Sequence, residues 1–324
     1  MGENRISFNQ IFCISIFTII TFLYSINTAA YSNADLLQSL KQTQSHINRL
    51  ATHMGVTPKS NQLYQAKQVE YHDIYFQLDR LYEKTRQLYF ENTNEFPPLT
   101  QQNKNTSSLE ASIMLTDKIN HILALLENHL LISNIHITKA QGPEPTNPIL
   151  LDMLVILNQN INQLVEHETQ PGDVYKLITL AVYYADEILN AMPVTKSVDR
   201  NITFIPNQKP YNVYVSLLKN IEILKEIGDA CHIHSIQLNS KILDEDKISP
   251  NDVEDLAQMT VGELSQLADN MNISLKNIDS YYPGKKYPSD VYQRSMLLQL
   301  QLTHILTYLK AHPDWARDHC HAKQ

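Results

Sequence analysis

Gln170-Pro171-Gly172-Asp173-Val174-Tyr175 is the first of four copies of a motif in the second half of the chain, with the pattern P-x-[DN]-V-[YE]. The prolines of successive copies are 39, 40 and 38 residues apart. Proline at the first helical position loses no hydrogen bond and presets φ, while an Asp or Asn two residues later faces the free amides and the positive end of the helix dipole. The motif therefore predicts helices that begin at Pro171, Pro210, Pro250 and Pro288.

One copy of the motif carries an additional sign of a helix start. Ser249-Pro250-Asn251-Asp252 resembles a capping box with Asp in place of Glu. Each copy leads into a run of helical spacing, which in the first copy comprises Val174, Leu177, Ala181, Tyr184 and Ile188. Helices of this kind could close into an antiparallel bundle or stack as an open solenoid, and we favour the bundle.

The first half of the chain also shows helical spacing. Apolar residues and a threonine step by four and three residues from Leu36 to Met54, and Gly55 stands where a glycine would end a helix. Further helices are expected from Thr57-Pro58 to about Phe90, from Ser107 to about Ser133, and from Asn147-Pro148 to near Glu168. The sequence thus predicts an all-α protein, a helical bundle of about eight helices in two four-helix units, the second built from four Pro-started repeats of 38 to 40 residues.

The expected organisation has four parts. Residues 1–30 are a secretory signal peptide, residues 31–168 an N-terminal helical unit, residues 169–311 a C-terminal helical repeat unit, and residues 312–324 a polar tail rich in Cys and His. Four connectors alternate apolar and polar residues and are expected to be short extended segments. These segments are Ile135-His136-Ile137, Ile202-Thr203-Phe204, Ile236-Gln237-Leu238 and Ile273-Ser274-Leu275.

The signal peptide is predicted from a short polar start and an uncharged apolar stretch. Arg5 precedes Ile11 to Ile26, and Asn27-Thr28-Ala29-Ala30 offers small residues for cleavage after Ala30. An uncleaved membrane anchor is the alternative, but the stretch falls short of the roughly 20 residues that span a bilayer. We therefore expect a periplasmic or secreted protein with no stable membrane span after cleavage.

Composition excludes several functional classes. The 324 residues include only seven glycines, and the motifs G-x-G-x-x-G, G-x-x-x-x-G-K-[ST] and G-x-S-x-G are absent. Nucleotide-binding and serine-hydrolase functions thus lose their usual sequence support. The formal charge is −8 and no basic stripe occurs, which argues against a nucleic-acid partner.

Two cysteines lie outside the signal, and histidines flank both. In an oxidising compartment such a pair usually forms a disulfide, so we predict a Cys231–Cys320 bond. The alternative is a Zn²⁺ or copper site built from thiolates and imidazoles. Its candidate ligands are Cys231, His232, His234, His319, Cys320 and His321.

Tyrosines recur at helical spacing in the second expected helix. Tyr64, Tyr71, Tyr75, Tyr82 and Tyr89 are separated by 7, 4, 7 and 7 residues. Such a stripe can line a partner-binding cleft because tyrosine combines an apolar ring with a hydroxyl group. The alternative is an ordinary packing seam with hydroxyls at its rim.

The sequence carries no recognisable catalytic constellation and predicts no cofactor. We therefore expect a non-enzymatic exported helical protein that acts as a protein-binding or scaffold component of the bacterial envelope. Its partner would be another envelope or secreted protein. The alternative is a periplasmic small-molecule or metal-binding sensor or carrier, which would use the tyrosine stripe or the Cys/His clusters.

Overall fold

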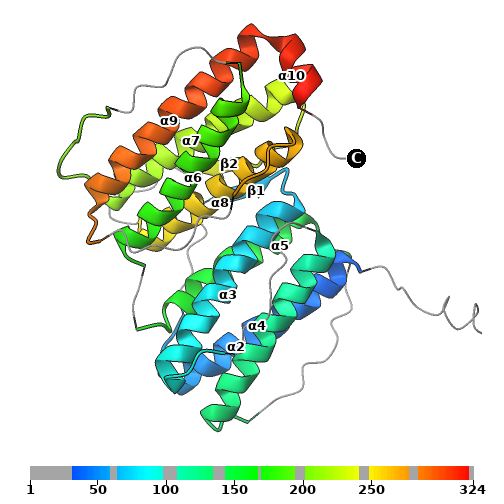
Figure 1. The fold of residues 1–324 in the computed structure, drawn as a ribbon. Helices are drawn as coiled ribbons and strands as arrows, with labels where there is room; N and C mark the ends of the chain where they lie inside the picture. Colours follow the sequence, from blue (N-terminus) through cyan, green and yellow to red (C-terminus); the bar gives the residue numbers. More distant parts are fainter. Residues whose placement is uncertain are drawn as a thin grey trace, which may run out of the picture. The chain divides into compact units, whose positions relative to one another are not determined.

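The computed structural model describes residues 31–58, 64–97, 108–133, 143–166, 169–193, 201–240, 248–276 and 284–320. The predicted signal peptide, residues 1–30, lies outside the described residues. The fold is all-α, as predicted, with one two-stranded sheet among the described residues (Figure 1). The elements in chain order are α2 (Asn33–His53), β1 (Tyr64–Lys67), α3 (Tyr71–Thr93), α4 (Leu109–His129), α5 (Asn147–Asn162), α6 (Pro171–Ala191), α7 (Pro210–Cys231), β2 (Gln237–Ser240), α8 (Pro250–Asn270), α9 (Pro288–Ala311) and α10 (Pro313–His319).

The helices form two four-helix groups with the same packing scheme. In the first group, α2 and α3 each pack on α4 and on α5. In the second group, α6 and α7 each pack on α8 and on α9, and Figure 1 shows these four helices side by side. Each group is therefore a closed bundle, which we call the first bundle and the second bundle.

Contacts of α8 with α3 and α5, and the pairing of β1 with β2, connect the two bundles. Asn33–Gln324 forms one compact unit by these contacts. The predicted boundary between residues 168 and 169 lies just before the start of α6 at Pro171. The division of the chain into two separate domains stays a prediction.

All eight bundle helices bury the same positions counted from their first residue. Positions 4, 8, 11 and 15 of every helix are at most 3% exposed. In α3 these positions hold Ile74, Leu78, Leu81 and Thr85; in α9 they hold Val291, Ser295, Leu298 and Leu302. The helices of the first bundle begin at Asn33, Tyr71, Leu109 and Asn147, at intervals of 38 residues. The repeat that the sequence showed in the second half therefore extends through the first half as well.

The four predicted helix starts are confirmed. Each proline is the first residue of its helix, and the third residue accepts a hydrogen bond from the backbone N–H of the residue before the proline. These acceptors are Asp173 (3.0 Å), Asn212 (2.9 Å), Asp252 (2.8 Å) and Asp290 (2.8 Å). The hydrogen bond satisfies an amide that the helix itself leaves free. Asp73 makes the same bond at the start of α3, without a proline (3.0 Å).

The prediction of a helix from Thr57-Pro58 is wrong for the described residues before Tyr71. Thr57 and Pro58 are not helical, and Tyr64–Lys67 is strand β1, paired antiparallel with β2 so that Tyr64 faces Ser240. Tyr64 and Ala66 alternate with exposed residues, and pairing with the distant strand β2 satisfies the backbone groups of this segment. The seven-residue spacing between Tyr64 and Tyr71 is compatible with a helix, although Tyr64 lies on a strand.

Other boundaries also differ from the prediction. α5 ends at Asn162 instead of near Glu168, and the predicted polar tail contains the short helix α10. Of the three expected extended segments that the structure describes, Ile236–Leu238 alone overlaps a strand. Residues 202–204 and 273–275 are in no strand, and residues 135–137 lie outside the described residues.

Candidate functional site

The predicted disulfide joins Cys231, the last residue of α7, to Cys320 after α10. The Cα atoms of the two cysteines are 5.3 Å apart, within the range of a disulfide. Both cysteines are buried. A disulfide offers no thiolate, so the cysteines in this form are not metal ligands.

The histidines next to these cysteines are exposed. His232 and His234 follow the end of α7, and the ring of His319 stacks on Trp315 with 4.3 Å between ring centroids. Among the residues that the structure describes, these histidines belong to no group that could hold a metal ion. His321 lies outside the described residues, so a metal site that includes it stays a prediction.

The five tyrosines of the predicted partner-binding stripe do not form an exposed surface. Tyr64 lies on β1 rather than on the helix, and its side chain is buried together with those of Tyr75 and Tyr82. Tyr71 and Tyr89 are partly buried against the core, and the Tyr71 hydroxyl donates to Asn33 Oδ1 at 2.9 Å. Burial therefore favours the packing seam over a binding cleft.

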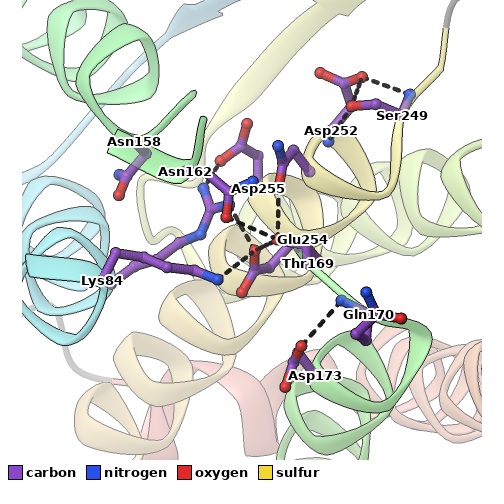
Figure 2. A network of polar contacts seen from close by, with 12 residues as sticks. Lys84, Asn158, Asn162, Thr169, Gln170, Asp173, Ser249, Asp252, Glu254 and Asp255 are labelled. Carbon is purple, nitrogen blue, oxygen red and sulfur yellow. Dashed lines mark hydrogen bonds and ion pairs between the residues drawn. The ribbon is translucent and has the colours of Figure 1, made fainter. Parts of the chain in front are cut away.

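The strongest concentration of buried charge lies where α3 of the first bundle meets α8 of the second. Arg80 donates to Glu254 at 2.7 Å and to Asp255, and Lys84 lies 4.0 Å from Glu254. Thr169, just before α6, donates to the same Glu254 oxygen at 2.6 Å (Figure 2). We call these five residues the interface network. All five are buried, so two cations face two carboxylates out of water.

Both helices position the interface network by antiparallel packing. Gln77, one turn before Arg80, donates to the backbone oxygen of Asp255, and Gln258 donates to the backbone oxygen of Phe76. The ring of Phe76 packs against Gly262, where an added Cβ would lie 3.3 Å from the ring. Glycine at this position therefore allows α3 and α8 to approach closely.

The electrostatics of the interface network differ between its two carboxylates. Burial raises the pKa of Asp255 to about 7, although Arg80 acts in the opposite direction. Burial also acts to raise the pKa of Glu254, but Arg80, Lys84 and the Thr169 hydroxyl outweigh it, so that the pKa is lowered. Glu254 is therefore the permanent anion of the network, and Asp255 titrates near neutral pH.

A second cluster lies further along the same interface, at the first turn of α3. His72 Nε2 is 3.0 Å from Asp73 Oδ1 and 3.4 Å from Glu263 Oε1, and all three residues are buried. Burial lowers the pKa of His72, but Asp73 and Glu263 outweigh this effect and raise it to about 10. Burial and the neighbouring Asp73 raise the pKa of Glu263 to about 7. Among the described residues this is the one group of histidine and carboxylate ligands that could hold a metal ion.

Comparisons with known protein families, with curated proteins and with solved structures found no match to this chain.

The sequence did not single out the residues of either buried cluster as a site. One signal could have indicated the interface network: the motif ends in Tyr175, Tyr214 and Tyr292 in three copies, but in Glu254 in the third copy along the chain. A charged residue at a position that holds a packing tyrosine in the other copies indicates that Glu254 has a different neighbour from those tyrosines. Nothing comparable in the sequence pairs His72 with Glu263, which are brought together only by the packing of α3 on α8.

Proposed function

We propose that the mature chain is a non-enzymatic, exported helical protein that acts as a protein-binding or scaffold component of the bacterial envelope, periplasmic or secreted. The observation that carries this proposal is the interface network between α3 and α8. Its buried charges are paired with one another across the two bundles. Removing one partner of such a pair is strongly unfavourable, because the other partner would then be a buried unpaired charge. A fixed arrangement of two bundles suits a scaffold.

Export is supported by the residues that precede the first helix and by the cysteines. The uncharged apolar stretch ends in small residues at Ala30, and the disulfide between Cys231 and Cys320 is of a kind that persists in oxidising compartments. No helix among the described residues is both long and apolar enough to cross a bilayer. Intact-mass analysis tests this part: the exported protein should begin at Tyr31, and a mature chain that retains Met1 would contradict it.

Exposed aromatic residues at the end of α3 are the candidate contact surface. The rings of Phe90 and Phe96 stack with 4.5 Å between their centroids, and Phe96 is 68% exposed. Aromatic side chains are enriched where proteins contact partners. A protein-binding function is expected to use this pair.

Site-specific photo-crosslinking in the intact cell envelope tests the protein-binding function. A photoreactive amino acid at Phe96 should give a discrete adduct with a second protein, and an excess of unlabelled purified protein should compete it away. The control position is Thr303, an exposed residue of α9. The same adducts from both positions, or no adduct from Phe96, would contradict the proposal.

One observation favours the alternative of a metal-binding protein. His72, Asp73 and Glu263 bring an imidazole nitrogen and two carboxylate oxygens within 4.8 Å of one another. These residues are not the Cys/His ligands that the sequence indicated. Crosslinking at Phe96 and metal binding at this cluster are separate measurements, so either function can fail without the other.

A further inference from the structure

The distances in the cluster of His72, Asp73 and Glu263 are those expected around a metal ion. A tetrahedral ion with ligand bonds near 2.0–2.1 Å places its ligand atoms about 3.3 Å from one another. His72 Nε2 lies 3.0 Å from one carboxylate oxygen and 3.4 Å from the other. The imidazole nitrogen therefore lies at a suitable distance from each carboxylate oxygen, and all three atoms lie within 4.8 Å of one another.

Two of these atoms are buried without a hydrogen bond of good geometry. His72 Nε2 and Asp73 Oδ1 lie 3.0 Å apart, close enough for an ion pair when the imidazole is protonated, yet neither atom makes a well-aligned hydrogen bond. His72 is 7% exposed and Asp73 is 1% exposed, so bulk water does not reach these atoms to act as their hydrogen-bond partner. Buried polar atoms normally have a partner, and a cation between these two atoms would supply one.

Backbone amides hold the two carboxylates in place. Asp73 Oδ2 accepts from the Glu70 amide at 3.0 Å, which leaves Oδ1 for the cluster. Glu263 Oε1, the oxygen 3.4 Å from His72 Nε2, also accepts from the Ile236 amide at 3.1 Å and keeps a second lone pair for the cluster. Glu70 Oε2 lies 3.9 Å from His72 Nδ1, on the side from which a carboxylate usually supports a metal-bound histidine. The ligands are thus oriented by neighbours that are not ligands.

The charge of the cluster also fits a divalent cation. A neutral imidazole and two carboxylates carry a charge of −2, which a divalent ion neutralises. The nitrogen and oxygen ligands suit a first-row transition-metal ion.

We propose that His72, Asp73 and Glu263 form a binding site for a divalent transition-metal ion, with Zn²⁺ as its representative, between α3 and α8. The first two ligands come from the first bundle and the third from the second, so the ion would connect the bundles. Binding releases the proton of the imidazolium form of His72. This site is independent of the protein-binding function proposed above.

The matched control is a second buried histidine in the first bundle. His46 Nδ1 lies 2.9 Å from Glu127, and Arg49 donates to the same carboxylate at 2.8 Å. An arginine therefore already occupies the position that a cation would take. Glu127→Gln removes a buried carboxylate of similar environment and should leave metal binding unchanged.

Isothermal titration of the exported, chelator-treated protein with ZnCl₂ tests the site. We expect one ion per chain and a midpoint of thermal unfolding that rises with zinc concentration. Glu263→Gln keeps the shape of the side chain and an acceptor for the Ile236 amide, yet it should lower zinc affinity at least about tenfold. Absence of stoichiometric binding, or equal affinity in Glu263→Gln, would overturn the site.

X-ray absorption of the zinc-loaded wild-type protein gives an answer that does not require a folded variant. The expected first shell is one imidazole with oxygen ligands. A shell with two or more imidazoles would place the ion on the exposed histidines near Cys231 and Cys320 instead. If the protein bound no zinc under these conditions, the proposal would be wrong, and protonated His72 would be the only positive charge that neutralises Asp73 and Glu263 in the cluster.

Discussion

Arg80 provides the sharpest test of whether the interface network holds the two bundles together. Arg80→Met keeps an unbranched apolar side chain and removes the charge. The side chain of Arg80 is only 4% exposed and contacts both Glu254 and Asp255. The variant leaves these two buried carboxylates with Lys84, 4.0 Å from Glu254, as the remaining cation of the network.

The expected loss is large because an unpaired charge stays buried. Removal of one partner of a buried ion pair costs about 3–5 kcal/mol of unfolding free energy. For a compact unit that extends from Asn33 to Gln324, an unfolding entropy of about 2.1 cal/mol/K per residue converts this loss into a decrease of roughly 5–8 °C in the unfolding midpoint. The loss should grow from acidic to neutral pH, because Arg80 lowers the pKa of Glu254 and the variant loses this stabilisation of the carboxylate.

Urea denaturation followed by circular dichroism, with calorimetry in parallel, measures the effect. The control is Lys310→Met, which breaks the ion pair with Glu226 between two side chains that are more than half exposed. Such a pair contributes at most about 1 kcal/mol. Above about pH 7, adding Asp255→Asn to Arg80→Met should recover part of the stability, because it removes one of the unpaired charges.

The reasoning would be refuted if Arg80→Met lost no more stability than Lys310→Met. It would also be refuted if the second substitution simply added a further loss. Calorimetry gives an additional signature: a weakened interface should split one unfolding transition into two, one for each bundle.

Three further predictions concern the helix starts, the disulfide and pH. Asp290→Ala removes the acceptor of the Tyr287 amide and should cost roughly 0.5–1 kcal/mol in urea denaturation; an unchanged midpoint would mean that Asp290 does not act as a cap. Cys320→Ser opens a loop of 89 residues and should lower the unfolding free energy by about 4 kcal/mol, and a reducing agent should then destabilise the wild type but not the variant. The folded state keeps a proton on Asp255 that the unfolded state, with a pKa of 3.8, releases, so stability should fall as pH rises from about 5 to about 7. Asp255→Asn should reduce this fall, and a stability that rises over the same range in the wild type would contradict the assignment.

The helix starts were predictable because their causes lie within a few residues of sequence. Proline and the acidic residue two positions later determine where a helix of the second bundle begins, and the structure places Pro171, Pro210, Pro250 and Pro288 as expected. The disulfide followed from the even number of cysteines outside the signal. These rules do not depend on which helices pack against each other in the folded protein.

The repeat could not be recognised in the sequence of the first bundle, because its helices lack the proline-containing motif that marks the helix starts of the second bundle. Only α2 and α3 of the first bundle have an acidic third residue, Asp35 and Asp73, and none of the four helices of this bundle begins with proline as its first residue. What the eight helices share is burial at fixed positions, which can be measured only after they have packed. The strand Tyr64–Lys67 was missed for a related reason, since its partner lies more than 160 residues away along the chain.

The buried clusters were unpredictable because each joins residues from both bundles. His72 and Glu263 are separated by 191 positions in the sequence, and no local pattern connects them. Glu254, which replaces a tyrosine of the repeated motif, was the one available signal. Such a replacement indicates that a neighbour differs, but it does not identify that neighbour.

The contact between α3 and α8 has a consequence for assembly, because the two bundles are built alike. It joins the second helix of one bundle to the third helix of the other, which makes it a head-to-tail contact between similar units, and such contacts can propagate without limit. The same positions of the two unused helices, α4 and α7, carry other residues. Where α8 has Glu254 and Asp255, α4 has Ile113 and Met114, and where α3 has Arg80, α7 has Lys219. Lys219 keeps the positive charge, but Ile113 and Met114 replace the two carboxylates, so the ion pairs of this junction are not expected to form again between α7 of one chain and α4 of another.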